Sequence, residues 1–495
     1  MKKIIYLPLD ERPCNFELPY SLSKCAVGYK MVRPQKSKMG LMKTPTSFEN
    51  NREFLLKNAG DSDIAILSLD QLLYGGIVPS RIHYLSVPEL RLRLETLKEI
   101  KLINPSLKIY LFSLVLRCPC YSSDEEEPMF YGKCGEEIFH YGVLKSKFQL
   151  GLINEEEFNT LSAPLKKKIG KNLDDFESRR NTNKTMIKTF IKDYSQYVDL
   201  FVIPQDDSEP FGYAMMDRVD IQKCLDENSV HANIYPGADE VGMVLLARAL
   251  SDDLGIKPEI TSVYPKEECK KMIPMFEAYP VHETMLKQLE TVGFKYVNDS
   301  KNKLFMNYPT KKSVNMGSTP NESYLERDLP SFVNKIADSV KNGDAVIICD
   351  GAYCNGGEAQ FLIDINKQVS LFDIYAYAGW NTSSNAMGTC LAQGMIRILF
   401  GNNDSQKYFT AERVIEDICY CGAVRWDVWH GYAPEHGYSL ENAGCKNGIV
   451  AKEIKRKLTL YLNENFKEIA SIYKINKCQL PWSRLFEVDL SLLKI

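Results

Sequence analysis

Residues Asp199 to Gly212 read D-L-F-V-I-P-Q-D-D-S-E-P-F-G. The apolar run from Leu200 to Pro204 predicts a fully buried strand, and Asp206 and Asp207 follow one residue later. Proteins of the α/β class present functional groups at the carboxyl ends of parallel strands. The stretch therefore predicts both an α/β fold and a candidate site, although an Asp in this place can also act only as the cap of the next helix.

Five other predicted strands end in polar residues that a site could use. Those strand ends carry Asp10, Asp70, Asp239 with Glu240, Asp350, and Trp380 with Asn381. One polar strand end is easily a helix cap, but six on one side of a parallel sheet would converge at the mouth of a barrel. The sequence therefore predicts a (β/α)8-like TIM barrel. Two doubly wound α/β domains, divided near residue 255, are the alternative.

The alternation of strands and helices is interrupted in two places. Residues 121–198 carry helical periodicity and no convincing strand, which predicts a helical insertion within the first part of the barrel, residues 1–255. The remaining predicted parts are a small α/β insertion at 256–330, the rest of the barrel at 331–425, and a C-terminal helical region at 426–495. The charged stretch Asp124 to Glu127 is expected to be solvated. Arg179 and Arg180 could reach the site from the last helix of the insertion, although a solvated helix face is the commoner outcome for such residues.

Composition excludes several classes of function. A net charge of −3 over 495 residues argues against a nucleic-acid partner, and the longest apolar run, Ile109 to Leu116, is too short to span a membrane. The 14 scattered cysteines and the lack of a signal-peptide core favour reduced thiols and a cytoplasmic location. Six histidines without metal-ligand spacing predict no metal and no cofactor. The oligomeric state stays open.

Abundant carboxylates, few histidines, and exposed amides and aromatic residues are the chemistry of sugar binding and glycosidic cleavage. A glycosidase needs one protonated carboxyl and a second, ionised group, and crowding acids together separates their pKa values. The predicted catalytic residues are Asp206, Asp207, Asp239 and Glu240. The predicted substrate-binding residues are Asp10, Arg12, Asn15, Asp70, Arg81, Asp350, Asn355, Trp380 and Asn381. The sequence thus favours a glycoside hydrolase with a small carbohydrate substrate.

Two other functions remain open at this point. One is a metal-dependent hydrolase of the phosphatase or deacetylase type, in which Asp10, Asp207, Asp239 and Asp350 would bind Mg²⁺ or Mn²⁺ through oxygen. The other is a non-catalytic sugar-binding protein, which would bind its ligand without turnover.

Several of these segments together resemble one bacterial family. They are P-L-D-E-R-P-C-N (Pro8 to Asn15), S-L-D-Q-L-L-Y-G-G-I-V-P-S-R (Ser68 to Arg81), P-Q-D-D-S (Pro204 to Ser208), Y-P-G-A-D-E (Tyr235 to Glu240) and Y-A-G-W-N-T (Tyr377 to Thr382). The combination looks like domain-of-unknown-function family 4127. The resemblance spans nearly the whole chain and implies a cytosolic-type bacterial protein, without implying an activity.

Two shorter resemblances concern chemistry. Adjacent Asp206 and Asp207 are similar to the Asp–Asp pair of O-GlcNAcase-type hexosaminidases. The G-A-D-E run that ends at Glu240 is similar to the G-G-D-E strand end of family-twenty β-hexosaminidases, with Ala238 in place of a Gly. In those enzymes the first acid orients the 2-acetamido group of the substrate and the second is the general acid. The two pairs cannot both have that role, so the resemblance implies a 2-acetamido sugar but leaves the pair open.

Overall fold

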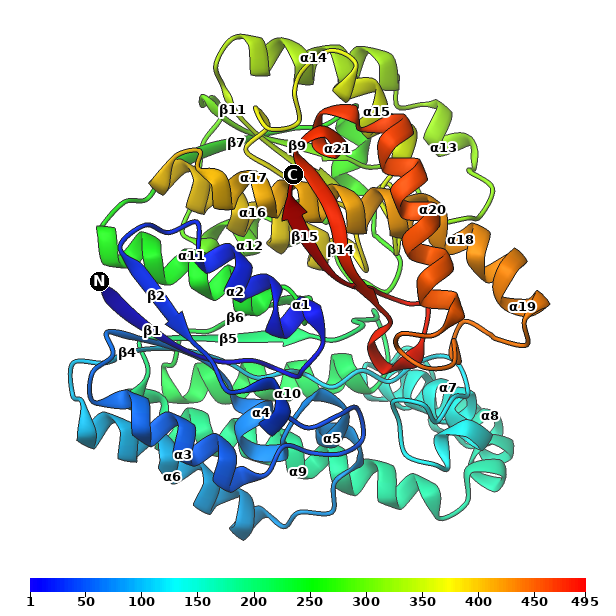
Figure 1. Ribbon diagram of the computed structural model, residues 1–495. Coiled ribbons are helices and arrows are strands. Elements are labelled where there is room, and N and C mark those ends of the chain that lie inside the picture. The colour runs from blue at the N-terminus through cyan, green and yellow to red at the C-terminus, as the bar shows by residue number, and fades with distance from the viewer. The chain divides into compact units, whose positions relative to one another are not determined.

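The computed structural model describes residues 1–495, which divide into two compact units. The first unit comprises Met1–Glu11, Gly28–Gly242 and Phe276–Ala278, and the second comprises Arg12–Val27, Met243–Met275 and Tyr279–Ile495. Each unit contains one large parallel sheet, and each unit is described by itself (Figure 1).

Six parallel strands form the sheet of the first unit. They are β1 (Lys2–Leu7), β2 (Tyr29–Val32), β3 (Ile64–Ser68), β4 (Lys108–Phe112), β5 (Leu200–Gln205) and β6 (Asn233–Pro236). Their order is β2-β1-β3-β4-β5-β6, and every neighbouring pair is parallel. The first five strands follow the 2-1-3-4-5 order that is typical of doubly wound α/β folds, in which the strand order reverses between β1 and β3.

Long amphipathic helices cover one face of this sheet. The helices of the first unit outside the segment between β4 and β5 are α3 (Phe48–Ala59), α4 (Leu69–Tyr74), α5 (Ile77–Ile82), α6 (Val87–Ile103) and α10 (Tyr213–Asn228). Strand residues such as Leu67, Ile109 and Ile203 share one core with helix residues such as Leu97 and Ile221. The predicted capping box at the start of α6, formed by Ser86 and Glu89, is confirmed.

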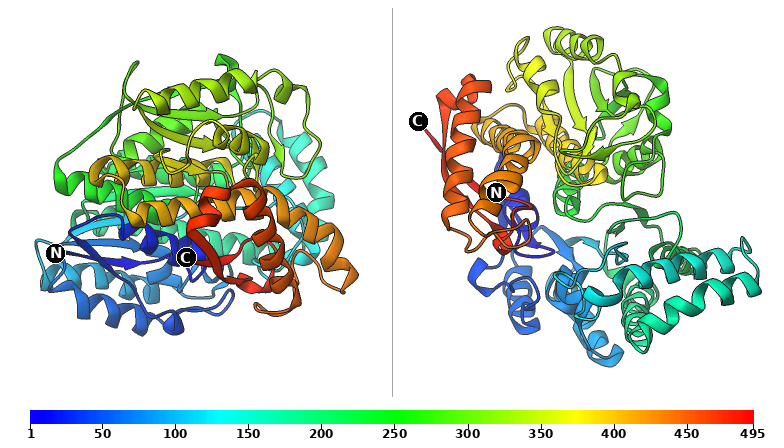
Figure 2. Two further views of the ribbon diagram at one scale, coloured as in Figure 1. Left: turned by 45° about the horizontal axis from the view of Figure 1, so that its top comes forward. Right: turned by 90° about the vertical axis from the view of Figure 1, so that its right-hand side faces the viewer.

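The segment between β4 and β5 contains helices and no strand. The helices are α7 (Tyr131–Gln149), α8 (Glu155–Ile169) and α9 (Asn172–Asp193). Figure 2 shows α7 and α8 side by side, extending away from the sheet of their unit. They have a small core of their own, which includes Tyr131, Ile138 and Phe176. Helix α9 also belongs to the main core through Met186 and Phe190.

The sheet of the second unit has five strands. They are β7 (Glu259–Val263), β8 (Lys295–Tyr296), β9 (Asn302–Asn307), β11 (Ala345–Asp350) and β13 (Ala376–Ala378). Their order, β8-β7-β9-β11-β13, repeats the 2-1-3-4-5 pattern of the first unit. The chain after residue 256 thus builds a second sheet in which β7 and β9 pair alongside β11 and β13.

Helices cover both faces of this second sheet. On one face lie α12 (Val281–Val292) and α16 (Ser383–Phe400). On the other face lie α14 (Leu329–Lys341), α15 (Ala359–Asn366) and a rare π-helix, η4 (Val414–Val424). The remaining α-helices of this unit are α1 (Pro13–Phe16), α2 (Leu18–Ser23), α11 (Val241–Leu254), α13 (Glu322–Leu325), α17 (Asp404–Arg413), α18 (Arg425–Asp427), α19 (Ala433–Glu435), α20 (Ile449–Asn465) and α21 (Lys467–Ile472). The remaining strands are β10 (Val314–Asn315), β12 (Tyr353–Cys354), β14 (Tyr473–Gln479) and β15 (Asp489–Lys494).

The predicted α/β class with parallel sheets is confirmed. The strand pairings form a six-stranded and a five-stranded sheet, and they do not show a closed barrel. Strands β14 and β15 pair as an antiparallel hairpin within the C-terminal region, for which the sequence predicted only helices. The strand order of each sheet is the one expected of the doubly wound alternative.

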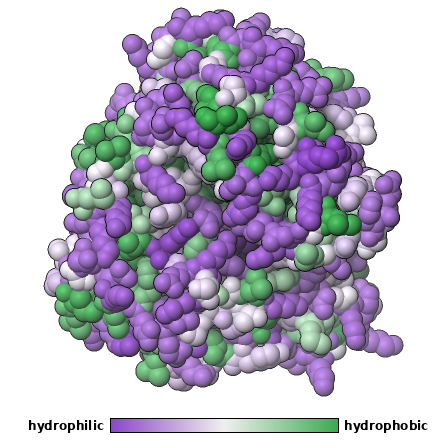
Figure 3. All heavy atoms as spheres, viewed as in Figure 1, coloured by the Kyte–Doolittle hydropathy of each residue, from purple (hydrophilic) through white to green (hydrophobic).

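None of the helices combines the length and the apolar character that crossing a membrane requires. Hydrophilic residues cover most of the face drawn in Figure 3, with apolar residues in small groups among them. Scattered exposed apolar residues of this kind are ordinary on protein surfaces.

Candidate functional site

In the first unit, polar residues of the candidate site follow the carboxyl ends of neighbouring strands. Strands β3, β4, β5 and β6 are consecutive in the sheet, so residues that follow them lie along one edge. Asp70 follows β3, Arg117 follows β4, and Asp206 with Asp207 follows β5. This edge brings together side chains that are up to 125 residues apart in the chain, as in the pair Arg81–Asp206.

Arg81 forms the central ion pair of this edge. It lies in α5, is 5% exposed, and donates from Nη2 to Asp206 Oδ2 at 2.6 Å. Its Nη1 donates to Glu126 Oε2 at 2.8 Å and lies 3.6 Å from Glu127 Oε1. The predicted residues Arg81 and Asp206 are therefore in direct contact, and a buried guanidinium balances the charge of the carboxylate.

Arg117 is a second cation that the sequence reasoning missed. Its Nε donates to Glu127 Oε1 at 2.9 Å, its Nη2 donates to Glu126 Oε2 at 3.2 Å, and its Nη1 lies 3.7 Å from Asp207 Oδ2. Glu127 is only 4% exposed, so the prediction that this acidic run is solvated is wrong for that residue. Glu127 is buried because Arg117 and Arg81 draw its carboxylate into the network. Arg117 follows the apolar run Ile109 to Leu116 directly, and that position was the available signal.

Asp207 has the electrostatic environment of a proton donor. Burial and the neighbouring carboxylate of Asp206 raise the pKa of Asp207 to about 7, against the opposing effect of Arg117 and Arg81. About half of the side chains are therefore protonated near neutral pH. The side chain keeps 25% of its surface exposed. Its backbone has a φ of 45°, a left-handed conformation that Asp tolerates better than most residues.

Asp70 is a buried residue that connects the ends of two strands. It is 2% exposed, and its Oδ2 accepts a hydrogen bond from the backbone N–H of Leu114 at 2.9 Å. Burial raises the pKa of Asp70 to about 7, although this hydrogen bond and one from Ser113 lower it. Asp70 therefore ties the end of β3 to the end of β4, and it presents little surface to a ligand.

Glu240 is a fully buried acid whose protonated form is favoured by its surroundings. It is fully buried, and its Oε2 accepts a hydrogen bond from the backbone N–H of Ala238 at 2.9 Å. Burial raises the pKa of Glu240 well above its usual value, and the nearby acids Asp239 and Glu277 add to the effect. Asp239 and Asp10 are 5% and 3% exposed. Of the two predicted acid pairs, only Asp206–Asp207 has a side chain with substantial exposure.

In the second unit, Asp350 is the centre of a buried hydrogen-bond network. It ends β11 and accepts from Asn307 Nδ2 at 2.9 Å, from Tyr377 Oη at 2.8 Å and from the backbone N–H of Glu358 at 2.8 Å. Burial and Glu358 raise the pKa of Asp350 to about 6. Arg327 binds Glu358 through two hydrogen bonds of 2.7 and 2.9 Å. Because Asp350 is 1% exposed, its main role here is to join neighbouring strand ends.

Two predicted substrate-binding amides are neighbours in the second unit. The backbone N–H of Asn355 donates to the carbonyl of Asn381 at 2.6 Å, and both residues have a positive φ, of 66° and 54°. Arg425 donates to the carbonyl of Asn355, and the Asn355 side chain donates to Asn315 Oδ1 at 3.0 Å. Strained backbone of this kind clusters at functional sites. Trp380 is 5% exposed and donates from Nε1 to Thr389, so its ring is packed in the core.

The C-terminal segment of the second unit holds Arg12. The guanidinium groups of Arg12 and Arg484 lie 4.9 and 4.4 Å from the ring centroid of Trp482, within the range of cation–π attraction. Asn15 donates to the sulfur of Cys14 at 3.6 Å. Sequence reasoning missed this segment, because an aromatic residue beside an arginine in a terminal loop has no periodic pattern.

The predicted residues thus fall into two sets. The first unit brings Arg81, Asp206 and Asp207 together, and the second brings Asn355 and Asn381 together. No group of three or more His, Cys, Asp or Glu side chains is arranged to hold a metal ion. In the first unit, Arg81 and Arg117 form ion pairs with the clustered carboxylates.

A family model described as "Protein of unknown function (DUF4127)" matches residues 4–491. The match covers nearly the whole chain, and the chain therefore belongs to this family. No curated protein and no solved structure matches the chain.

Proposed function

We propose that this member of the DUF4127 family is a glycoside hydrolase whose catalytic carboxyl groups are Asp206 and Asp207. One observation carries the proposal: the two adjacent acids have opposite environments. Asp206 forms a 2.6 Å ion pair with the buried Arg81, whereas the pKa of Asp207 is raised to about 7. Cleavage of a glycosidic bond needs one carboxyl that can give up a proton and one that is negatively charged.

In the proposed reaction, Asp207 protonates the oxygen of the leaving group. A pKa near the working pH is the best compromise for a general acid, because the group must be protonated and must also release its proton. Asp206, held by the 2.6 Å ion pair with Arg81, orients the substrate. If the substrate is a 2-acetamido sugar, the acetamido group is the natural partner of that carboxylate and can itself act as the nucleophile.

Tyr121 is a candidate contact for the sugar ring. It is 46% exposed. Arg117 lowers the pKa of Tyr121, whereas burial and Asp207 raise it, and the net effect is a rise. Arg117, which lies 3.7 Å from Asp207, thus also acts on the phenol of Tyr121. An exposed ring beside a general acid suits the apolar face of a pyranose.

Activity on 4-nitrophenyl glycosides, with and without a 2-acetamido group, tests the proposal. We expect Asp207→Asn to lower kcat/KM by about 10²–10⁴-fold, the usual contribution of a general acid. A substrate with a better leaving group, such as a dinitrophenyl glycoside, should recover much of the loss because it needs no proton. Glu209→Gln, two residues further along the same loop, is the matched control and should keep its activity.

Unchanged activity of both Asp207→Asn and Glu240→Gln would reject a role for either predicted pair. Saturable sugar binding without turnover by the wild type would instead favour the non-catalytic sugar-binding protein. Inhibition by EDTA would favour the metal-dependent hydrolase, for which no three candidate ligands are grouped.

A further inference from the structure

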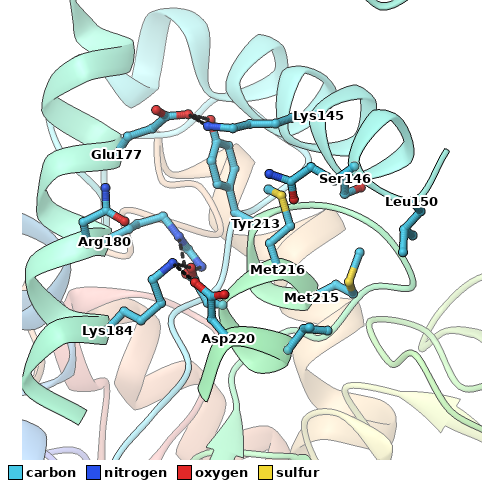
Figure 4. A pocket seen from close by; sticks show the side chains of 14 residues that line it. Lys145, Ser146, Leu150, Glu177, Arg180, Lys184, Tyr213, Met215, Met216 and Asp220 are labelled. Carbon is cyan, nitrogen blue, oxygen red and sulfur yellow. Dashed lines mark hydrogen bonds and ion pairs between the residues drawn. The ribbon is translucent and has the colours of Figure 1, made fainter. Parts of the chain in front are cut away.

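A pocket of about 360 Å³ lies between helices α7, α9 and α10 of the first unit. This volume is at the lower end of the range for small-molecule sites, about 300–1,000 Å³. Figure 4 shows charged side chains of α9 on one side and Met215, Met216 and Leu150 on the other. The pocket contains neither Asp206 nor Asp207.

The innermost charged group of the pocket is Arg180. It is 4% exposed, donates from Nε to Asp217 Oδ2 at 2.9 Å, and has Nη2 at 2.7 Å from the same oxygen. Lys184 lies 3.1 Å from Asp217 Oδ1 and 2.7 Å from Asp220 Oδ2. The prediction that Arg179 and Arg180 lie on a solvated helix face is therefore wrong, because both are about 5% exposed or less.

A second polar group lines the upper part of the pocket in Figure 4. Lys145 Nζ lies 2.7 Å from Glu177 Oε1, and Tyr213 donates its hydroxyl to the same oxygen at 2.5 Å. Altogether the lining contains three cations, Lys145, Arg180 and Lys184, and three anions, Glu177, Asp217 and Asp220. The wall therefore offers many donors and acceptors but no net charge.

The charge balance decides which ligand the pocket suits. A ligand with a net charge could form an ion pair with the wall only by breaking one of the ion pairs that are already there. A hydroxyl group both donates and accepts, so it can bridge a lysine and a carboxylate without separating them. The apolar side chains of Met215, Met216 and Val219 can contact the C–H faces of a ring.

The pocket also adjoins the loop that carries the proposed acid. Arg180 donates from Nη1 to the carbonyl of Arg117 and from Nη2 to that of Leu116, both at 2.8 Å. Those carbonyls belong to the segment after β4. On the loop of Asp207 itself, the backbone N–H of Gly212 donates to Ser146 Oγ at 2.9 Å. A ligand here would therefore lie against groups that position both Arg117 and the segment after Asp207.

We propose that this pocket is a second carbohydrate-binding site, which takes a neutral, hydroxyl-rich ring beside the loop of Asp207. The inference rests on the proposed function only for the class of ligand, and it extends that function by adding a subsite that holds the sugar chain. It does not depend on turnover, so binding can test it alone.

Three probes with the same ring and different charge test the chemistry: glucose, glucuronate and glucosamine. Ligand-observed NMR titrations give a Kd for each. We expect glucose to bind most tightly, and we expect Val219→Trp, which introduces a large ring at the edge of the pocket, to weaken glucose binding at least tenfold. Val219 is 50% exposed, so the fold should tolerate the change.

Lys223→Trp is the matched control, because Lys223 lies on the same helix, is 75% exposed and does not line the pocket. It should bind glucose like the wild type. Leu150→Trp, at the opposite edge, repeats the test if Val219→Trp does not fold. Tighter binding of glucuronate or glucosamine, equal binding by the Val219 and Lys223 variants, or no saturable glucose binding would overturn the proposal.

The same titrations in Asp207→Asn separate the two proposals. A binding event that survives this substitution and is lost in Val219→Trp belongs to the pocket, whatever happens to turnover. Loss of turnover with intact, Val219-dependent binding leaves the pocket in place even if Asp207 has no catalytic role.

Discussion

Replacing Asp207 with Asn should stabilise the protein at neutral pH, although it is expected to abolish most of the activity. Burial and Asp206 raise the pKa of Asp207 from 3.8 to about 7. The folded protein therefore binds this proton more tightly than the unfolded chain does. Between these two pKa values the folded state loses stability as the pH rises, because ionisation is easier in the unfolded chain. Asn does not ionise, so the variant does not lose this stability as the pH rises.

The magnitude follows from the pKa difference. Each tenfold change in proton affinity is worth about 1.4 kcal/mol, so a rise from 3.8 to about 7 is worth about 4 kcal/mol above pH 7. Because 25% of the Asp207 side chain is exposed, screening by water lowers the expected gain to about 2–4 kcal/mol. Asn also tolerates the left-handed backbone at this position, so the substitution adds little strain.

Calorimetric melting of wild type and Asp207→Asn between pH 4 and pH 8.5 measures the effect. For a unit of 150–250 residues, 1 kcal/mol corresponds to about 2–4 °C in Tm. We expect Asp207→Asn to melt at least about 4 °C above the wild type at pH 8, with the difference fading toward pH 4. A difference that does not change with pH would refute the reasoning, since it would mean that Asp207 ionises normally in the folded protein.

Asp220→Asn is a control of opposite sign. Burial acts to raise the pKa of Asp220, but Lys184 and Lys188 hold it below its usual value. Its carboxylate therefore adds stability above the unfolded pKa, and that contribution is lost as the pH falls. Asp220→Asn should melt below the wild type at neutral pH and approach it in acid.

Three further substitutions test other parts of the site. Arg180→Lys keeps the positive charge but loses the guanidinium hydrogen bonds to the carbonyls of Leu116 and Arg117. Because Arg117 lowers the pKa of Asp207, a less well positioned Arg117 should move the basic limb of the pH profile of kcat/KM to higher pH. If that limb does not move, Arg180 has a purely structural role. Glu240→Gln should leave Tm at pH 6 within about 2 °C, less than about 1 kcal/mol, because burial already favours the neutral form of the acid. A large loss of Tm would contradict that preference. Arg81→Met leaves the buried carboxylate of Asp206 without its ion-pair partner. The free energy of unfolding, measured with denaturant, should fall by about 3–5 kcal/mol. A change near zero would contradict a buried ion pair.

The local parts of the fold were predictable because they depend on nearby residues. The apolar run before Asp206 predicts β5, and the structure has β5 at Leu200–Gln205. The capping box that starts α6 was also read correctly from Ser86 and Glu89. Each of these features is decided within a few residues by side-chain alternation or by a local hydrogen bond.

The order of the strands in the sheets was harder to predict from the sequence, because an alternation of strand and helix is common to barrels and to doubly wound sheets. The difference lies in which strands pair: β2 and β6 are the two edges of the first sheet, while β7 and β9 pair in a second sheet. Those pairings join residues far apart in the chain, and each strand has a similar apolar pattern. Periodicity predicts that the strands exist without specifying their partners.

In the candidate site, too, some features depend on neighbouring residues and others on residues far apart in the chain. Asp206 and Asp207 stand out in the sequence because two acids follow a buried strand. The sequence alone could not separate their roles, because the separation comes from groups in other segments: Arg81 lies against one carboxylate, and Arg117 is 3.7 Å from the other. Strand β5 ends at Gln205, and Asp207 has a left-handed φ of 45°, so the two acidic side chains need not follow the simple alternation of a strand. Two neighbouring acids can then differ in charge at one pH, and this asymmetry is what an acid–base reaction requires.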